Sequence, residues 1–284
     1  MPKLPRFLRP ATESAPPSEP APEPEGLNTK YFGLLDAQLS GWFLSDTDEL
    51  YRGMPISADD VVVDVGCGEG GNLSFCAQRG AHVIGIDLDE ESVNTARERI
   101  ADTPARVQEF HVAPAEHLPV ADGAATRVMC TEVIEHVDDP SVVLTELVRI
   151  GAPGAIYLIT VPDALQERMQ KEVANPEYFE FPNHIRIVER DEFARLVSDA
   201  GLEVLSQAGY GFYWSIWWAM YWASQDDESV QRPWLSEMSD PHPALQAWTE
   251  AWNELLKTPK GREIKAGLDR FMPKSQVIIA RKPG

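Results

Sequence analysis

The chain has 284 residues, 43% of them hydrophobic, and it carries a formal net charge of −20 with a pI near 4.6. That length and apolar content suffice for one large domain or two small ones with a sizeable core. The strong negative charge argues against nucleic acid and against anionic lipid as partners, because both are bound mainly through lysine and arginine.

Residues 1–26 are rich in proline, glutamate, serine and alanine, a composition that buries little apolar surface, and we expect a disordered tail there. Residues 27–57 carry apolar side chains whose spacing predicts one or two helices, which we expect to form an N-terminal helical cover. The start of the chain lacks the apolar segment of a secretion signal, and no apolar run is long enough to cross a membrane. The three cysteines lack metal or disulfide spacing, so we expect a cytoplasmic protein.

From residue 58 onward, strand and helix patterns alternate, which predicts an α/β fold with a parallel sheet covered by helices on both faces. The expected strands lie near 61–65, 82–86, 107–111, 127–131, 155–161, 202–208 and 275–281. The expected helices lie near 71–79, 90–101, 140–150 and 191–200.

A glycine-rich turn follows the first of these strands. Asp64 ends the apolar run, Gly66, Gly68 and Gly70 follow at alternate positions, and Asp87 ends the next apolar run about twenty residues later. Glycines let a backbone approach a ligand closely, and an acid at the end of the second strand can accept hydrogen bonds from ribose hydroxyls. An acid at position 64 would repel a pyrophosphate but suits a cationic or zwitterionic nucleoside.

This arrangement resembles motif I of the class I S-adenosylmethionine (SAM) methyltransferases. Residues 58–208 are similar to the broad group that includes the ubiquinone-biosynthesis O-methyltransferases. The resemblance is carried by five ordered stretches, namely 64–70, 85–87, 115–119, 131–137 and 151–154. It implies a Rossmann-like sheet of seven strands in which the strand at 275–281 is antiparallel, residues 58–284 as the methyltransferase domain, and residues 210–274 as an aromatic-rich helical insertion.

The resemblance also implies a cofactor site for SAM. Asp64 would orient the ammonium group, and Asp87 would hold the ribose hydroxyls. The other residues implied at this site are Gly66, Gly68, Gly70, Leu88, Ala115, Glu116 and Thr131. One departure is Pro114, since many relatives have aspartate there, which leaves the adenine amino group to Glu116 or to backbone.

A second cluster, formed by Glu132, Glu135 and His136, follows the fourth strand. On a helix, this spacing places all three side chains on one face, where two carboxylates and an imidazole suit Mg²⁺ or Mn²⁺. With a later histidine, His184, the cluster resembles the metal site of the small-RNA 2′-O-methyltransferases. Without a metal, the glutamates would be solvated and His136 would pack near the sulfonium or cap a turn, while His184 would be a structural hydrogen bonder. If functional, His136 and His184 are the candidate catalytic residues.

Aromatic side chains crowd residues 210–222, and Trp214, Trp217, Trp218 and Tyr221 fall on one helical face. Three interpretations stay open: core packing of the insertion against the sheet, a lid over an aromatic or glycan substrate, and a surface for an oligomer or a membrane interface. Trp248 and Trp252 are spaced to pack a second helix on the first.

We therefore expect a SAM-dependent methyltransferase that acts on a hydroxyl group of a small molecule or glycan, with divalent-metal assistance if the glutamate–histidine cluster is a metal site. One alternative is an N-methyltransferase of an amine or amino sugar that needs no metal. Another, of a different class, is a SAM-binding regulatory module without catalysis. The sequence does not identify the acceptor.

Overall fold

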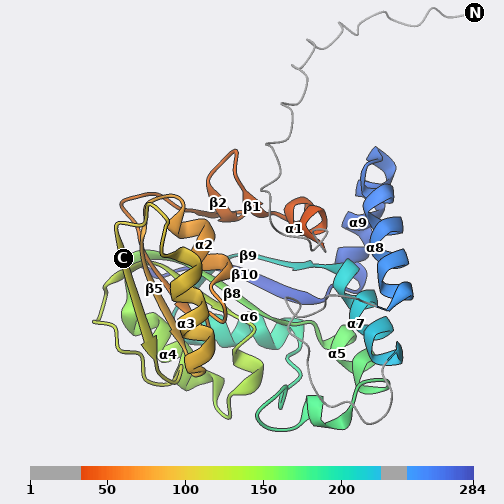
Figure 1. Ribbon diagram of the computed structural model, residues 1–284. Coiled ribbons are helices and arrows are strands. Elements are labelled where there is room, and N and C mark those ends of the chain that lie inside the picture. Colours follow the sequence, from red (N-terminus) through yellow and green to blue (C-terminus); the bar gives the residue numbers. More distant parts are fainter. Residues whose placement is uncertain (1–32, 225–241) are drawn as a thin grey trace, which may run out of the picture. The chain divides into compact units, whose positions relative to one another are not determined.

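The computed structural model describes residues 33–224 and 242–284, so the expected N-terminal tail and residues 225–241 of the expected insertion lie outside the described residues. At its centre is a seven-stranded sheet with the order β6-β5-β4-β7-β8-β10-β9 (Figure 1). Its strands are β4 (Val61–Val65), β5 (His82–Asp87), β6 (Val107–Val112), β7 (Ala125–Thr131), β8 (Gly151–Pro162), β9 (Glu203–Tyr210) and β10 (Ser275–Arg281).

The strands from β6 to β8 are parallel, whereas β10 pairs antiparallel with both β8 and β9. This confirms the expected antiparallel last strand. The order reverses at β4, which lies between β5 and β7, and ligands of open α/β sheets bind beyond the carboxyl ends of the strands at such a switch point.

Helices cover both faces of the sheet (Figure 1). The helices α4 (Pro140–Ile150) and α6 (Arg190–Asp199) pack on the face that includes Val63 and Ile159. On the opposite face, α2 (Gly71–Ala77) and α3 (Glu90–Ile100) pack on Val62 and Leu158. Because β4 is covered on both sides, it is a continuous apolar run rather than an alternating one.

The region before β4 is only partly helical, whereas one or two helices were expected over 27–57. It contains one short helix, α1 (Leu34–Ser40), followed by a three-stranded antiparallel sheet of β1 (Trp42–Leu44), β2 (Glu49–Tyr51) and β3 (Met54–Pro55). Gly41, with φ of 107°, ends α1, and Gly53, with φ of 94°, turns β2 into β3. These turns use a backbone conformation open mainly to glycine, which converts an aromatic pattern that looks helical into short strands.

Further helices complete the chain. Between β8 and β9 lie α5 (Ala164–Lys171) and the short 3₁₀ helix η2 (Pro176–Phe179). Between β9 and β10 lie α7 (Phe212–Ser224), α8 (Pro243–Leu256) and α9 (Pro259–Phe271). The side chains of Trp217, Tyr221 and Trp252 are buried in a separate apolar cluster that α7 and α8 share with part of α1. Core packing therefore accounts for much of the aromatic bias, with helices rather than the sheet as the packing partner.

Within the described ranges, no helix is both long enough and apolar enough to cross a membrane.

Candidate functional site

The loop from Gly66 to Gly70 joins β4 to α2. Each of its three glycines differs in what surrounds the position of an added side chain. All have positive φ, of 73° at Gly66, 47° at Gly68 and 79° at Gly70. A Cβ at Gly66 would lie 2.2 Å from Cγ2 of Val133, and one at Gly70 would lie 2.9 Å from Cβ of Ala96. A Cβ at Gly68 would meet no atom of the described residues within 4 Å. Only the middle glycine therefore borders open space, where a ligand can approach the backbone closely.

Asp87 ends β5 beside this loop. Its carboxylate accepts hydrogen bonds from the backbone N–H groups of Gly68, at 2.8 Å, and Asp89, at 3.0 Å. These contacts hold the loop and the acid together. Each carboxylate oxygen has a second lone pair, so Asp87 can still accept a hydroxyl from a ligand.

Asp64 lies one strand away and is only 1% exposed. Its Oδ1 atom has no hydrogen-bond partner in the described part of the chain. Burial, together with the negative charge of Asp87, raises the pKa of Asp64 well above its usual range. A cationic group brought close to this carboxylate would reverse that shift.

The other residues expected at the cofactor site lie at the carboxyl ends of neighbouring strands. Thr131 ends β7 and accepts a hydrogen bond from Nδ2 of Asn72 at 3.4 Å. Leu88 follows β5 and is 72% exposed, which leaves its side chain available to pack on a ligand. Ala115 and Glu116 follow β6, the first half-buried and the second exposed. The structure thus gathers the expected residues around one edge of the sheet, and their roles stay predictions.

Three of the four expected metal-binding residues also come together. Glu135 and His136 lie in the 3₁₀ helix η1 (Ile134–His136), and His184 lies in the loop before α6. One side-chain ligand atom from each of the three lies within 4.8 Å of the others. The two imidazole rings are 4.9 Å apart between centroids and nearly perpendicular.

Both histidines have the same ring nitrogen engaged. Nδ1 of His136 lies 2.9 Å from the carbonyl oxygen of Asn183, and Nδ1 of His184 lies 2.9 Å from Oε2 of Glu167. A carbonyl or carboxylate oxygen only accepts, so Nδ1 donates in each case and Nε2 carries the lone pair of the neutral ring. A hydrogen bond of this kind fixes the ring orientation of metal-binding histidines.

Glu135 is fully buried, and neither of its carboxylate oxygens has a hydrogen-bond partner among the described residues. Burial, reinforced by the charge of Glu132, raises the pKa of Glu135 well above its usual range. A buried carboxylate without a partner is costly. The donor set of one carboxylate and two imidazoles therefore fits a divalent cation.

Glu132 does not join this group, which corrects the expectation that all four residues share one site. Its backbone has φ of 57°, and η1 begins only at Ile134, so the expected helical face does not form. The Glu132 carboxylate instead accepts hydrogen bonds from Thr160 and Ser275 and pairs with Lys274. Burial alone would raise the pKa of Glu132, but the Lys274 charge and these hydrogen bonds hold it below its usual range.

Sequence reasoning missed the polar residues of α5 near this site. Glu167, which contacts His184, is fully buried together with Gln166 and Gln170. Their spacing would have placed them on one helical face, but polar residues on a helix are normally assigned to solvent. No pattern within the helix reveals that this polar face is the buried one.

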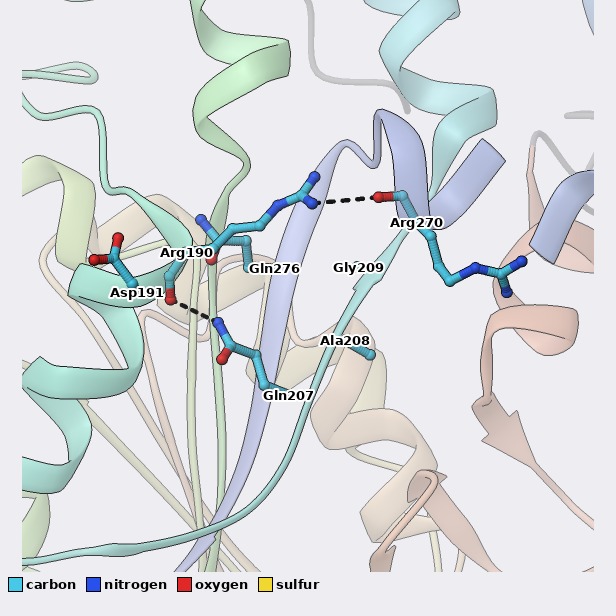
Figure 2. A pocket seen from close by; sticks show the side chains of 7 residues that line it. All are labelled: Arg190, Asp191, Gln207, Ala208, Gly209, Arg270 and Gln276. Carbon is cyan, nitrogen blue, oxygen red and sulfur yellow. Dashed lines mark hydrogen bonds between the residues drawn. The ribbon is translucent and has the colours of Figure 1, made fainter. Parts of the chain in front are cut away.

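A pocket of about 480 Å³ lies elsewhere, between β9, α6 and the end of α9 (Figure 2). Arg190, one of the two arginines that line the pocket, donates through Nε to Asp163 and through Nη1 to the carbonyl oxygen of Arg270. The carbonyl oxygen of Arg190 accepts from Nε2 of Gln207. These internal contacts account for the polar groups of Arg190, and we assign no function to the pocket.

Comparison with known proteins identifies the part of the chain that surrounds the glycine loop. A family model described as a methyltransferase domain matches residues 63–159. The methyltransferase GfsG of Streptomyces halstedii is 31% identical over 164 residues, which cover 56% of this chain and 58% of that protein. A ubiquinone biosynthesis O-methyltransferase of Dechloromonas aromatica is 30% identical over 157 residues, covering 53% of this chain and 68% of that protein. The chain thus spans well over half, but not all, of the length of these relatives.

Structural similarity to known proteins covers more of the chain than sequence similarity does. A solved structure of a geranyl diphosphate methyltransferase in complex with SAM superposes with a TM-score of 0.55 and 18% identity, over 87% of this chain and 85% of that one. At this identity, the likeness bears on the fold alone.

Proposed function

We propose a reaction for this chain, which belongs to the class I SAM-dependent methyltransferases. In this proposal, a methyl group passes from SAM to a hydroxyl group of a small molecule or glycan, with the help of a bound divalent cation. The family membership rests on the matches above. The choice of a hydroxyl acceptor and the assistance of a metal rest on the residues around Glu135.

The cofactor side of the proposal is supported by the surroundings of Gly68. The space beside this glycine is open, and Asp87 borders it with acceptor oxygens suited to ribose hydroxyls. Asp64 is a buried carboxylate that needs a cationic partner, and SAM has both an ammonium and a sulfonium group. A dinucleotide would instead bring a pyrophosphate close to this carboxylate, which is unfavourable.

The observation that carries the proposal is the contact between the two halves of the site. Val133, which directly precedes η1, packs so closely on Gly66 that position 66 cannot accept a side chain. The segment that contains Glu135 and His136 therefore packs against the proposed cofactor loop. In an in-line methyl transfer, the acceptor must lie beside the cofactor, and catalysis depends largely on such positioning.

A hydroxyl group is a poor nucleophile near neutral pH, so the acceptor side must remove or weaken its proton. Glu135 and the Nε2 atoms of His136 and His184 would hold the cation. When bound, the cation would lower the pKa of a hydroxyl group next to it. Asn183 and Glu167 keep the two imidazoles oriented as ligands. An Nε2 atom that holds the cation cannot also accept a proton, so the hydroxyl group beside the cation would release its proton to water. A neutral ring that does not bind the cation could accept the proton at Nε2 instead.

The donor set also bears on which cation is held. Mg²⁺ prefers oxygen ligands in a near-ideal octahedron, and Glu132, the second carboxylate expected from the sequence, is engaged by Lys274. Two imidazoles and one carboxylate suit Mn²⁺ or another transition metal better. We therefore propose that Mn²⁺ supports turnover at lower concentration than Mg²⁺.

The test uses the full chain, radiolabelled SAM and a panel of catechols, methyl glycosides and amines. We expect methyl transfer to a hydroxyl compound that stops in EDTA and returns with Mn²⁺. Transfer to an amine that continues in EDTA would favour the metal-free N-methyltransferase. Tight SAM binding without turnover on any acceptor would favour the regulatory module. Either result would overturn the proposal.

A further inference from the structure

Helix α5 buries polar side chains and exposes an apolar one, which is the reverse of an ordinary surface helix. Its side chains Gln166, Glu167 and Gln170 are fully buried, whereas Leu165 on the other side is 42% exposed. A surface helix normally buries its apolar stripe and exposes its polar one. The reversal places polar side chains of α5 in the protein interior.

The buried amides of this face are not satisfied by the protein. Neither the oxygen nor the nitrogen of the Gln166 and Gln170 side chains has a hydrogen-bond partner within the described ranges. Gln276, another buried glutamine, is partly satisfied: its Nε2 donates to the carbonyl oxygen of Val188 at 2.9 Å, while its Oε1 has no partner among the described residues. Buried polar groups without partners are rare in native proteins and call for a specific explanation.

These amides flank Glu167 on α5, and Glu167 lies on the acceptor side of the site. Glu167, which lies between them in the helix, contacts His184, and the Tyr178 ring lies 4.5 Å from the His184 ring and 5.4 Å from that of Trp222. α5 also packs beside α7 (Figure 1). On α7, the indole N–H groups of Trp217 and Trp222 are buried and likewise have no partner among the described residues.

We infer that the acceptor is a neutral ring compound with several hydroxyl groups, such as a hexose, whose hydroxyls pair with the amides of Gln166 and Gln170. This inference rests on the proposed function and narrows its substrate class. A carboxamide both donates and accepts, and so does a hydroxyl group, so a polyol can satisfy all four amide atoms. The indole N–H groups of α7 add donors, and the aromatic rings add flat apolar faces.

The amides of Gln166 and Gln170 are uncharged, which suits a neutral ligand. The ionisable groups near His184 carry both signs, with Glu135 and Glu167 set against Arg186 and the proposed cation, and add no preference for an anion. Lys274 is committed to Glu132. An apolar acceptor would fit no better, because it would leave the amides of Gln166 and Gln170 unpaired after binding.

The experiment compares Gln166→Leu and Gln170→Leu with Leu165→Gln, a control on the exposed side of the same helix. The full chain is loaded with S-adenosylhomocysteine and offered three probes by ligand-observed NMR: methyl α-D-glucopyranoside, catechol and geraniol. We expect the glucoside to bind and each Leu variant to weaken its binding at least tenfold, with the control unchanged. The melting temperature of each Leu variant should stay level or rise, because an unpaired buried amide is removed.

The inference is overturned if the glucoside does not bind, if catechol or geraniol binds more tightly, or if the Leu variants bind the glucoside as well as the wild type. Titration of SAM in the same samples tests the proposed function separately from the substrate class. Intact SAM binding with no preference for the glucoside rejects only the substrate class, whereas loss of SAM binding in the wild type rejects the proposed function.

Discussion

Nδ1 of His184 lies 2.9 Å from Oε2 of Glu167, and this pair joins α5 to the loop that precedes α6. The contact fixes which nitrogen of His184 faces the proposed cation. Glu167 touches neither cofactor nor acceptor in this account, so it is a positioning residue. Its substitution tests whether the orientation of His184 matters for turnover.

Glu167→Gln should lower both turnover and Mn²⁺ affinity by roughly 10- to 100-fold, as is typical when the partner of a metal-binding histidine is lost. SAM affinity should stay unchanged, because Glu167 lies on the acceptor side. Glu172→Gln, an exposed neighbour at the end of the same helix, is the control. Titration of Mn²⁺ alongside turnover checks the prediction, and unchanged metal affinity with a lowered melting temperature would make Glu167 merely structural.

Glu135→Ala and His136→Ala should lower turnover far more than SAM affinity, since both residues face the acceptor in this account. The loss should be at least about 100-fold in kcat, in line with the removal of acid–base or metal assistance. Kinetics at saturating SAM and SAM titration together check this. A large loss of SAM affinity with intact kcat would move both residues to the cofactor pocket.

Gly68→Ala and Gly154→Ala form a matched pair. Both glycines have positive φ, of 47° and 79°, and in the part of the chain that the structure describes neither has an atom within 4 Å of an added Cβ. Each substitution should therefore cost about 1 kcal/mol of stability through backbone strain. Only Gly68→Ala should weaken SAM binding, by tenfold or more, because only that Cβ enters the proposed cofactor space. Equal SAM affinity in the two variants would place the cofactor elsewhere.

Asp87→Ala should also weaken SAM binding sharply, by an order of magnitude or more, since the ribose hydroxyls lose their acceptor. Asp87 accepts the Gly68 N–H as well, so part of the loss would come from a less ordered loop. Asp102→Ala, an exposed residue after α3, is the control. The dissociation constant for SAM is the measurement, and a wild-type value for Asp87→Ala would refute this cofactor placement.

Asp36 predicts a pH dependence of stability. It is buried between Lys265, at 3.2 Å, and Nε1 of Trp252, at 2.9 Å, and burial raises its pKa from 3.8 to about 6. The folded chain therefore keeps this proton between about pH 4 and 6 while the unfolded chain has lost it. Stability should fall as pH rises through that window, by roughly 3 kcal/mol from this group, and change no further above it.

Asp36→Asn removes this titration. The difference in unfolding free energy between variant and wild type should therefore shift in favour of the variant by about 3 kcal/mol between pH 4 and pH 7. The exposed Asp46→Asn should follow the wild-type profile. Denaturant unfolding across this range is the measurement, and parallel profiles for Asp36→Asn and the wild type would contradict the shifted pKa.

The sequence predicted the sheet and the glycine loop well because their signals are local. The apolar runs of β4 and β5 have a strand pattern, and Gly66, Gly68 and Gly70 mark the turn. The antiparallel β10 was expected from the family resemblance and is confirmed.

Other features could not be predicted because they depend on distant partners. Glu132 was placed with Glu135 by helical spacing, but its left-handed backbone and its pairing with Lys274, more than a hundred residues away, direct it elsewhere. The buried polar face of α5 depends on His184 and on α7, which the sequence of the helix does not reveal. The short strands after Gly41, two of which are joined at Gly53, were read as helix for a similar reason.

The most direct test of the account is a crystal structure of the full chain grown with S-adenosylhomocysteine and Mn²⁺. We expect the ribose hydroxyls to lie at Asp87 and the amino-acid tail to lie near Asp64 and the backbone of Gly68. We expect Mn²⁺ to be bound by Glu135, His136 and His184. A crevice beside Gly68 that stays empty at saturating ligand, or that binds a dinucleotide in preference, would contradict it.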